Sequence, residues 1–373
     1  MILNKKYLLK NTIDIYVTEM EDKRVLITFH KITTRDRIEI VTSKTVAEFI
    51  ALLNGENAID KILSQLSLDA SMCQPHDLID FLLKNKLIVE KKSEVAPTRY
   101  DRQEVFFDDL YLSQDGGDSQ KLLSDKTIVF LGCGAFSGAL AEILVRMGVK
   151  HITLVDYKKV THSTLARHLY ARVDDIGENK VDVLESYLKR INASLDVKKF
   201  STNITYNYDL TKLISTSSDL VVNGLDEPYI GHTSLKIGRY LHPLKIPMYV
   251  MGGFDAHLMS SGELINPPQT PCIDCVQNSF QVALKEWVPY YNSNTVNADP
   301  AKDFIKGNRI YSGGLCLMSN FSAYLSAATI IDFFLSGKDS LRDCTVRYEY
   351  LPNKGEITKF KTSKKTGCAV CYG

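Results

Sequence analysis

The sequence predicts an α/β protein with a doubly wound, mostly parallel sheet, preceded by a small α+β domain of the winged-helix type. Two patterns lead to this prediction. From residue 127 onward, short apolar runs alternate with amphipathic runs, as in a parallel sheet with crossover helices. The chain before that point begins with alternating strands and changes to a helical period. The 373 residues suffice for both domains, which we place at 1–92 and 93–373.

The N-terminal domain is predicted from its periodicity. Alternating apolar residues indicate strands at 13–20, 24–30, 37–41 and 87–90. Helical spacing indicates helices at 45–53, 58–67 and 78–85, with Asn54-Gly55 as a helix stop. This arrangement resembles the peptide-recognition element of enzymes that modify ribosomally made peptides. The resemblance implies that a leader peptide adds as a strand to the hairpin edge, beside the third helix. A DNA-binding winged helix and a dimerisation module are the alternatives.

Charge and hydropathy limit the classes of function. Lys and Arg number 45 against 44 Asp and Glu, so the formal net charge is only +1. We therefore expect neither nucleic acid nor a membrane surface as a partner. The first residues contain no apolar signal segment, and no apolar run is long enough to span a bilayer. The sequence thus predicts a cytoplasmic protein.

Residues 127–156 form the clearest motif. An apolar run, a glycine turn at Gly132 and Gly134, an amphipathic run and a second apolar run ending in Asp156 predict a βαβ nucleotide-binding unit. The glycines would let the backbone approach phosphate, and the following helix N-terminus offers N–H groups to an anion. Asp156 is expected to hold ribose hydroxyls. A βαβ unit without a ligand is the alternative.

Other stretches match, in order, those of the E1-type adenylating family, which includes the sulfur-carrier and molybdopterin-synthase activating enzymes. The resemblance covers residues 98–373. Besides the Rossmann-like glycine turn, it rests on Arg99-Tyr-Asp-Arg-Gln103, Thr164-Leu-Ala-Arg167-His168, Asp175-Ile-Gly-Glu-Asn-Lys180 and Val221-Val-Asn-Gly-Leu-Asp226.

The resemblance implies adenylation with ATP and Mg²⁺ in a homodimer. Arg102 would reach across a dimer interface to the ATP phosphates. Arg167 and Lys180 would contact the triphosphate of their own subunit, and Asp226 would help to bind magnesium. These charges suit the reaction, because attack of a carboxylate on the α-phosphate moves negative charge onto the departing pyrophosphate.

The chain departs from the family pattern around the nucleotide. Ala135 and Ser137 stand where relatives carry glycine, and Gly138 lies one position late. Lys158, Thr164 and His168 replace a usual acid, Asn and Gln, respectively. We therefore expect a differently shaped phosphate turn, in which the Ser137 hydroxyl contributes to binding.

Two C-x-x-C pairs predict a metal site. Cys272 with Cys275, and Cys368 with Cys371, match a Cys₄ zinc site, and the family closes such a site in the same two places. Four thiolates leave no open position, so the zinc would be structural. Redox C-x-x-C chemistry is the alternative, and the absence of a thioredoxin-like βαβ setting disfavours it.

Residues 276–314 contain no cysteine, which argues against transfer of the acyl group to an enzyme thiol. Cys316 follows and is expected at a helix start, packed in the core. The pattern resembles the peptide-modifying relatives of microcin C7 and pantocin A biosynthesis. It implies activation of a precursor-peptide carboxylate and capture by a nucleophile of the same peptide, as in the pantocin case. Alternatives are activation of a peptide C-terminus, of a ubiquitin-like sulfur carrier, or a scaffold role. The polar, aromatic stretch 285–309 is expected either to order over the peptide or to be a solvated crossover loop, which is the more common case.

Overall fold

The computed structural model describes residues 3–66, 75–91, 98–111, 115–205, 207–227, 229–253, 259–284, 316–336 and 343–372. The chain divides into two compact units, Met1–Lys121 and Leu122–Gly373. The stretch 285–309 lies outside the described residues, so the structure gives no account of it.

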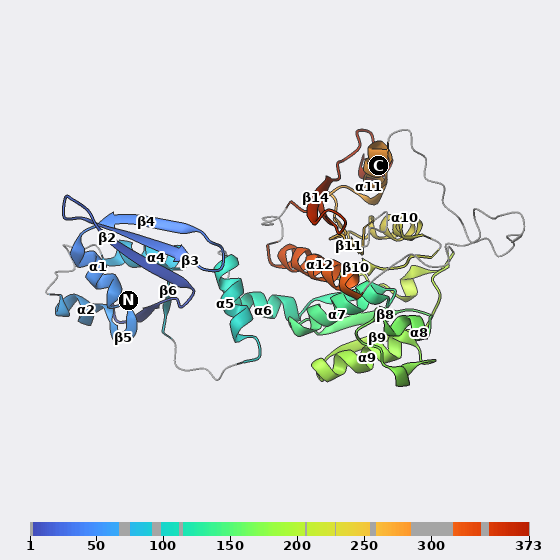
Figure 1. Ribbon diagram of the computed structural model, residues 1–373, viewed down its shortest axis with the longest axis horizontal. Helices are drawn as coiled ribbons and strands as arrows, with labels where there is room; N and C mark the ends of the chain where they lie inside the picture. The colour runs from blue at the N-terminus through green and yellow to red at the C-terminus, as the bar shows by residue number, and fades with distance from the viewer. Residues whose placement is uncertain are drawn as a thin grey trace, which may run out of the picture. The chain divides into compact units, whose positions relative to one another are not determined.

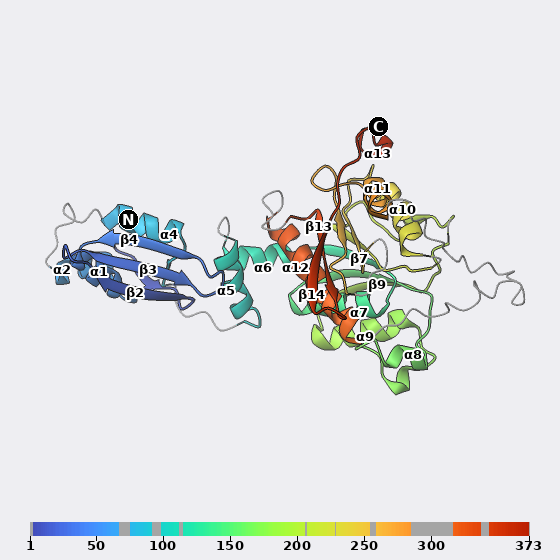
Figure 2. The same ribbon diagram turned by 45° about the horizontal axis from the view of Figure 1, so that its top comes forward.

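Two three-stranded antiparallel sheets form the N-terminal unit. One has the order β5-β1-β6 and the other β2-β3-β4. The strands are β1 (Lys6–Leu9), β2 (Ile13–Glu19), β3 (Val25–Lys31), β4 (Arg37–Thr42), β5 (Asn54–Ala58) and β6 (Ile88–Glu90). Figure 2 shows β2, β3 and β4 side by side. The predicted hairpin and third strand are therefore confirmed.

Three helices of the described residues pack against the strands of this unit. They are α1 (Lys44–Ala51), α2 (Ile59–Gln65) and α4 (Pro75–Lys84). Alternation along β3 buries Val25, Ile27 and Phe29, and Ile27 and Phe29 join the helices in one hydrophobic core. The predicted helix stop at Asn54-Gly55 is confirmed, because α1 ends at Ala51 and α2 starts only at Ile59. The strand that lies between the two helices was not predicted. Residues 54–58 form β5, a strand that pairs with β1 although its sequence is polar.

A buried ion network attaches α5 (Asp101–Leu110) to the rest of the N-terminal unit. The Lys10 ammonium lies 2.5 Å from an Asp108 carboxylate oxygen and also contacts Asp109. Lys86 lies 2.7 Å from the other Asp108 oxygen. Burial makes such pairs costly to break, because each charge would lose its partner away from water. The helix that carries Arg102 therefore belongs to the N-terminal unit, which extends to Lys121, whereas the sequence prediction ended this domain at residue 92.

The second unit contains the predicted doubly wound sheet. Its order is β12-β11-β10-β7-β8-β9, parallel except for β12. The strands are β7 (Thr127–Leu131), β8 (His151–Val155), β9 (Asp196–Phe200), β10 (Leu220–Asn223), β11 (Met248–Val250) and β12 (Glu263–Ile265). The chain reverses its direction of winding between β7 and β10. In such sheets ligands bind beyond the carboxyl ends of the strands at this switch point.

Helices flank the sheet. They are α6 (Gly116–Ser124), which crosses the boundary between the units, α7 (Ala135–Arg146), α8 (His162–Leu165), α9 (Lys180–Ile191), α10 (Ile230–Leu241), α11 (Ile273–Leu284), α12 (Cys316–Ser336) and α13 (Ala369–Tyr372). Short 3₁₀ turns, η1 (Val173–Asp175) and η2 (Leu210–Lys212), and a hairpin of β13 (Val346–Leu351) and β14 (Glu356–Lys361) complete the unit. Figure 1 shows α12 running along α7. Within the described residues, no helix is both long and apolar enough to cross a membrane.

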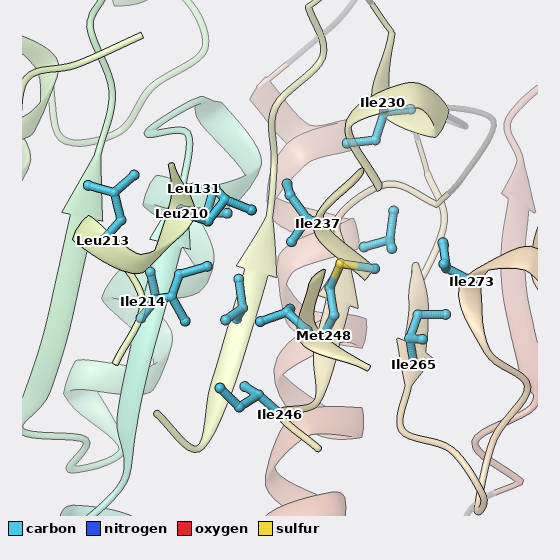
Figure 3. Close-up of a cluster of buried hydrophobic side chains, with 14 of the residues drawn as sticks. Leu131, Leu210, Leu213, Ile214, Ile230, Ile237, Ile246, Met248, Ile265 and Ile273 are labelled. Atoms are coloured by element: carbon cyan, nitrogen blue, oxygen red, sulfur yellow. The ribbon is translucent and has the colours of Figure 1, made fainter. Parts of the chain in front are cut away.

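The central strands are held by a continuous apolar core. It joins side chains of the sheet to those of α10 and α11, including Ile237, Met248, Ile265 and Ile273 (Figure 3). The four residues of β10 are all buried, which explains the apolar run Leu220-Val-Val222, and the amide of the buried Asn223 donates to the Ser234 hydroxyl at 2.9 Å. This rigid base fixes the carboxyl ends of β7 and β10.

Candidate active site and metal centre

The glycine turn after β7 requires glycine at position 132. Gly132 has φ +92°, a conformation that disfavours side chains, and a Cβ there would lie 2.9 Å from the Gly224 carbonyl oxygen. The Gly224 N–H in turn donates to the Leu131 carbonyl at 2.8 Å. The turn and the end of β10 are therefore in direct contact.

Gly134 opens the turn to an incoming group. It is the N-cap of α7, has no side-chain cap, and a Cβ there would meet no atom within 4 Å. The first N–H groups of a helix have no intrahelical acceptor, so the start of α7 offers them to an anion. The geometry matches that expected of a phosphate-binding turn.

Asp156, directly after β8, holds the same turn. Its carboxylate accepts hydrogen bonds from the N–H of Cys133 and the N–H of Lys158, both at 2.8 Å. The side chain is buried, and both oxygens serve the backbone. Holding the turn is a role that the motif alone did not indicate. It leaves the second lone pair of each oxygen for the predicted ribose contact.

The Ser137 hydroxyl lies against Gly224. The side chain is 1% exposed, and its oxygen has no hydrogen-bond partner among the described residues. A Cβ on Gly224 would fall 2.3 Å from that oxygen, so only glycine fits there. Buried hydroxyls in folded proteins almost always have a hydrogen-bond partner. The Ser137 hydroxyl is therefore consistent with a site in which a bound ligand or water supplies that partner.

Gly138 explains why a glycine stands one position late in the turn. A Cβ at position 138 would fall 2.6 Å from the ring of Tyr170. The glycine therefore makes room for an aromatic side chain from the segment after α8. Sequence reasoning missed Tyr170, because only the tertiary contact relates it to the turn.

Positive charge gathers beside the turn. Lys180 begins α9, and burial lowers the pKa of its ammonium, while the nearby carboxylates of Asp156 and Asp226 oppose this effect. Within the described part of the chain, Lys180 forms no ion pair. Arg167 is half-buried, and its charge helps to lower the pKa of the neighbouring His168. The structure thus brings Lys180 close enough to Asp156 and Asp226 to interact with both.

An acid adjacent to Asp226 has a role that the sequence did not indicate. Glu227 accepts a hydrogen bond from the Tyr157 hydroxyl at 2.7 Å and lies 2.6 Å from the Lys158 ammonium. This pairing gives the basic residue at position 158 a structural role. Asp226 itself is exposed, with its carboxylate available to a cation.

Arg102 lies in the first turn of α5, in the N-terminal unit, and is exposed. It is the one predicted catalytic residue that falls outside the second unit.

The four predicted zinc ligands form one cluster. Their sulfur atoms all lie within 4.8 Å of one another, with Cys272 and Cys368 at 3.6 Å and Cys275 and Cys371 at 3.7 Å. Tetrahedral zinc with Zn–S bonds of 2.3 Å sets its sulfurs about 3.8 Å apart, so the cluster fits this metal. The Lys365 N–H donates to the Cys275 sulfur at 3.2 Å, as expected for a metal thiolate.

The redox alternative fits less well. Cys272 and Cys275 lie at the start of α11, and Cys368 and Cys371 lie at α13. The preceding strand β12 is antiparallel, however, which differs from a thioredoxin-like βαβ unit. A redox pair also needs two sulfurs, whereas four meet here.

The chain belongs to the ThiF family, whose model matches residues 106–370. It is similar to the sulfur carrier protein ThiS adenylyltransferase of Bacillus subtilis, with 28% identity over 190 residues, which is 49% of this chain and 52% of that protein. The chain spans about half or less of the length of the curated relatives it matches.

Solved structures share the fold over nearly the whole chain. Escherichia coli MccB with ATP has a TM-score of 0.70 at 20% identity, covering 98% of this chain and 99% of that one. Another structure of MccB, the microcin C7 biosynthetic enzyme, is a complex with N-formylated MccA. PaaA has a TM-score of 0.65 at 16% identity, covering 93% of this chain and 98% of that one. At these identities the likeness establishes a common fold.

Proposed function

We propose that the chain is an ATP-dependent adenylating enzyme that activates a carboxylate of a ribosomally made precursor peptide. The observation that carries this proposal is the half-buried ammonium of Lys180, which has no ion-pair partner among the described residues and interacts with Asp156 beside the open turn at Gly134. Membership of the ThiF family and the full-length fold shared with MccB support it.

The reaction needs charge compensation more than covalent catalysis. A carboxylate oxygen of the peptide attacks the α-phosphorus of ATP, and the bond from that phosphorus to the bridging oxygen breaks. The products are an acyl adenylate and pyrophosphate. Lys180 and Arg167 neutralise the negative charge that moves to the leaving group. Asp226 would hold magnesium, which would supply further positive charge to the phosphate groups of ATP.

The N-terminal unit is proposed to bind the leader part of the peptide. Within the described residues, β2 has β3 as its single strand neighbour, so its other edge can accept a further strand. Tyr16 and Val17 on β2 are 57% and 56% exposed, which is unusual for apolar side chains on an edge strand. An extended peptide that pairs with β2 would cover both.

The activated carboxyl carbon is then attacked by a nucleophile of the same peptide, with AMP as leaving group, which closes a ring. A second function, activation of a sulfur-carrier protein, is favoured by the similarity to the ThiS adenylyltransferase. Exchange of labelled pyrophosphate into ATP, stimulated by the peptide or by the carrier, separates the two functions.

The proposal predicts that Lys180→Ala and Asp226→Ala abolish peptide-dependent pyrophosphate exchange, at least a hundredfold, because the leaving group loses charge compensation. Peptide affinity measured by calorimetry should not change. The matched control is Lys189→Ala, which removes an exposed lysine from the same helix. Exchange in both variants at the wild-type rate would refute adenylation at this site.

A further inference from the structure

Two consecutive peptide groups of the glycine turn are each held by a buried side chain. The Cys133 N–H donates to the Asp156 carboxylate at 2.8 Å. The Cys133 carbonyl accepts a hydrogen bond from the Tyr170 hydroxyl at 2.6 Å. Tyr170 is 2% exposed, and burial keeps its pKa well above the usual value, so the phenol stays protonated and can donate. The backbone on both sides of the Cys133 Cα is thus fixed in orientation.

His168 completes this arrangement. Its Nδ1 lies 3.0 Å from the Tyr170 hydroxyl, and the two rings meet edge to face. The phenol has one proton, which goes to the Cys133 carbonyl, so His168 Nδ1 must carry a proton and donate to the phenol oxygen. Burial and the charges of Lys180 and Arg167 lower the pKa of His168 to about 3, which keeps the imidazole neutral. His168 is therefore the Nδ1–H tautomer.

The orientation of the carbonyl determines that of the next N–H. In a trans peptide the C=O and N–H point in opposite directions, and the Cys133–Gly134 peptide is trans. Since the Cys133 carbonyl points at Tyr170, the Gly134 N–H points away from Tyr170. A Cβ on Gly134 would meet no atom within 4 Å, so open space lies beside this residue.

We propose that Tyr170 and His168 are positioning residues that orient the Gly134 N–H toward a nucleotide phosphate by holding the Cys133 carbonyl. This inference rests on the proposed function, because it names how the turn of that site is shaped. It also accounts for two departures from the family pattern, the glycine at position 138 and the histidine at position 168.

Direct binding of a non-hydrolysable ATP analogue to the full chain, measured by calorimetry, tests the proposal. Tyr170→Phe removes only the hydroxyl and should weaken binding about tenfold, the equivalent of one hydrogen bond. His168→Leu should weaken it similarly. His168→Asn should restore most of the affinity, because the asparagine Nδ2 occupies the position of Nδ1 and can donate. Thermal melting and zinc content report whether each variant is folded.

Gly138→Ala provides a second, independent test of the proposal. Its methyl group would displace the Tyr170 ring and with it the hydroxyl. The loss of affinity should therefore not add to that of Tyr170→Phe in the double variant. Fully additive losses would overturn the proposed route through the hydroxyl.

The outcomes separate this inference from the proposed function. Failure of the wild-type protein to bind the analogue refutes the proposed function. Binding by the wild type with unchanged affinity in Tyr170→Phe refutes the positioning role alone. Nitrogen-15 spectra of histidine-labelled protein give a readout that does not depend on nucleotide. They should show His168 as the Nδ1–H tautomer, and the Nε2–H tautomer would overturn the proposal.

Discussion

A neutral, buried imidazole at position 168 makes the folded protein sensitive to acid. Its pKa is about 3 in the folded chain, against 6.5 when free. Between these values the unfolded chain binds a proton that the folded chain excludes, so stability falls as the pH drops below about 6.5.

We predict that His168→Asn, which does not titrate, loses less stability on acidification than the wild type. The difference in the free energy of unfolding between the two proteins should change by about 2 kcal/mol from pH 8 to pH 5 in favour of the variant. Urea unfolding at both pH values measures it. Parallel curves for the two proteins would contradict a depressed pKa at this position.

The role of a residue could be predicted where a local sequence motif indicates it. Gly132 and Gly134 follow from the turn, and the four cysteines follow from their paired spacing. Tyr170 and Glu227 could not be found in this way, because each acts through a partner on another element: the Cys133 carbonyl for Tyr170, and Lys158 for Glu227. A phenol or a carboxylate at those positions looks like many others in the sequence.

At the scale of elements, the segments with apolar periodicity were predicted, including short strands, whereas a polar strand was not. The crossover helices and the parallel strands of the second unit appear where the periodicity indicates. Strand β5 reads Asn-Gly-Glu-Asn-Ala, which has turn-forming residues and no apolar alternation, and it is a strand because β1 lies beside it. The extent of the compact N-terminal unit, which includes α5, could not be read from the sequence for a similar reason. Lys10 and Asp108 look like surface charges in the sequence, yet their burial attaches α5 to the N-terminal unit.

The cysteine cluster connects the start of α11 to the last helix, α13. We predict about one zinc per chain by elemental analysis, and none in the double variant Cys368→Ser, Cys371→Ser. Without zinc no metal joins the four thiols, so limited proteolysis should remove the C-terminal segment faster and the melting temperature should fall.

Cys344→Ser is the matched control, because Cys344 is half-buried and lies outside the cluster. It should retain the metal. A wild-type protein that carries no zinc and has all four thiols reactive would contradict the prediction.

At the scale of the whole molecule, the predicted phosphate-binding cations come from both units. Lys180 and Arg167 lie beside the glycine turn, whereas Arg102 lies on α5 of the N-terminal unit, which is also the unit proposed to bind the leader peptide. A peptide that engages this unit would therefore be bound by the same unit that carries Arg102, the arginine predicted to contact the ATP phosphates. The ion pairs of Lys10 with the half-buried Asp108 and the buried Asp109 attach α5 to the rest of that unit.

We predict that a site is completed by Arg102 of a second copy of the chain. Arg102→Ala and Lys180→Ala should each be inactive alone. If Arg102 acts across a two-fold dimer, a heterodimer of the two variants contains one intact site and one doubly defective site. An equimolar mixture, unfolded and refolded or co-expressed, should then recover about a quarter of the wild-type pyrophosphate exchange.

A mixture of Lys180→Ala with Asp226→Ala is the control. Both changes lie in the second unit, so its heterodimers have no intact site and should remain inactive. Recovery in neither mixture would place Arg102 within the site of its own subunit.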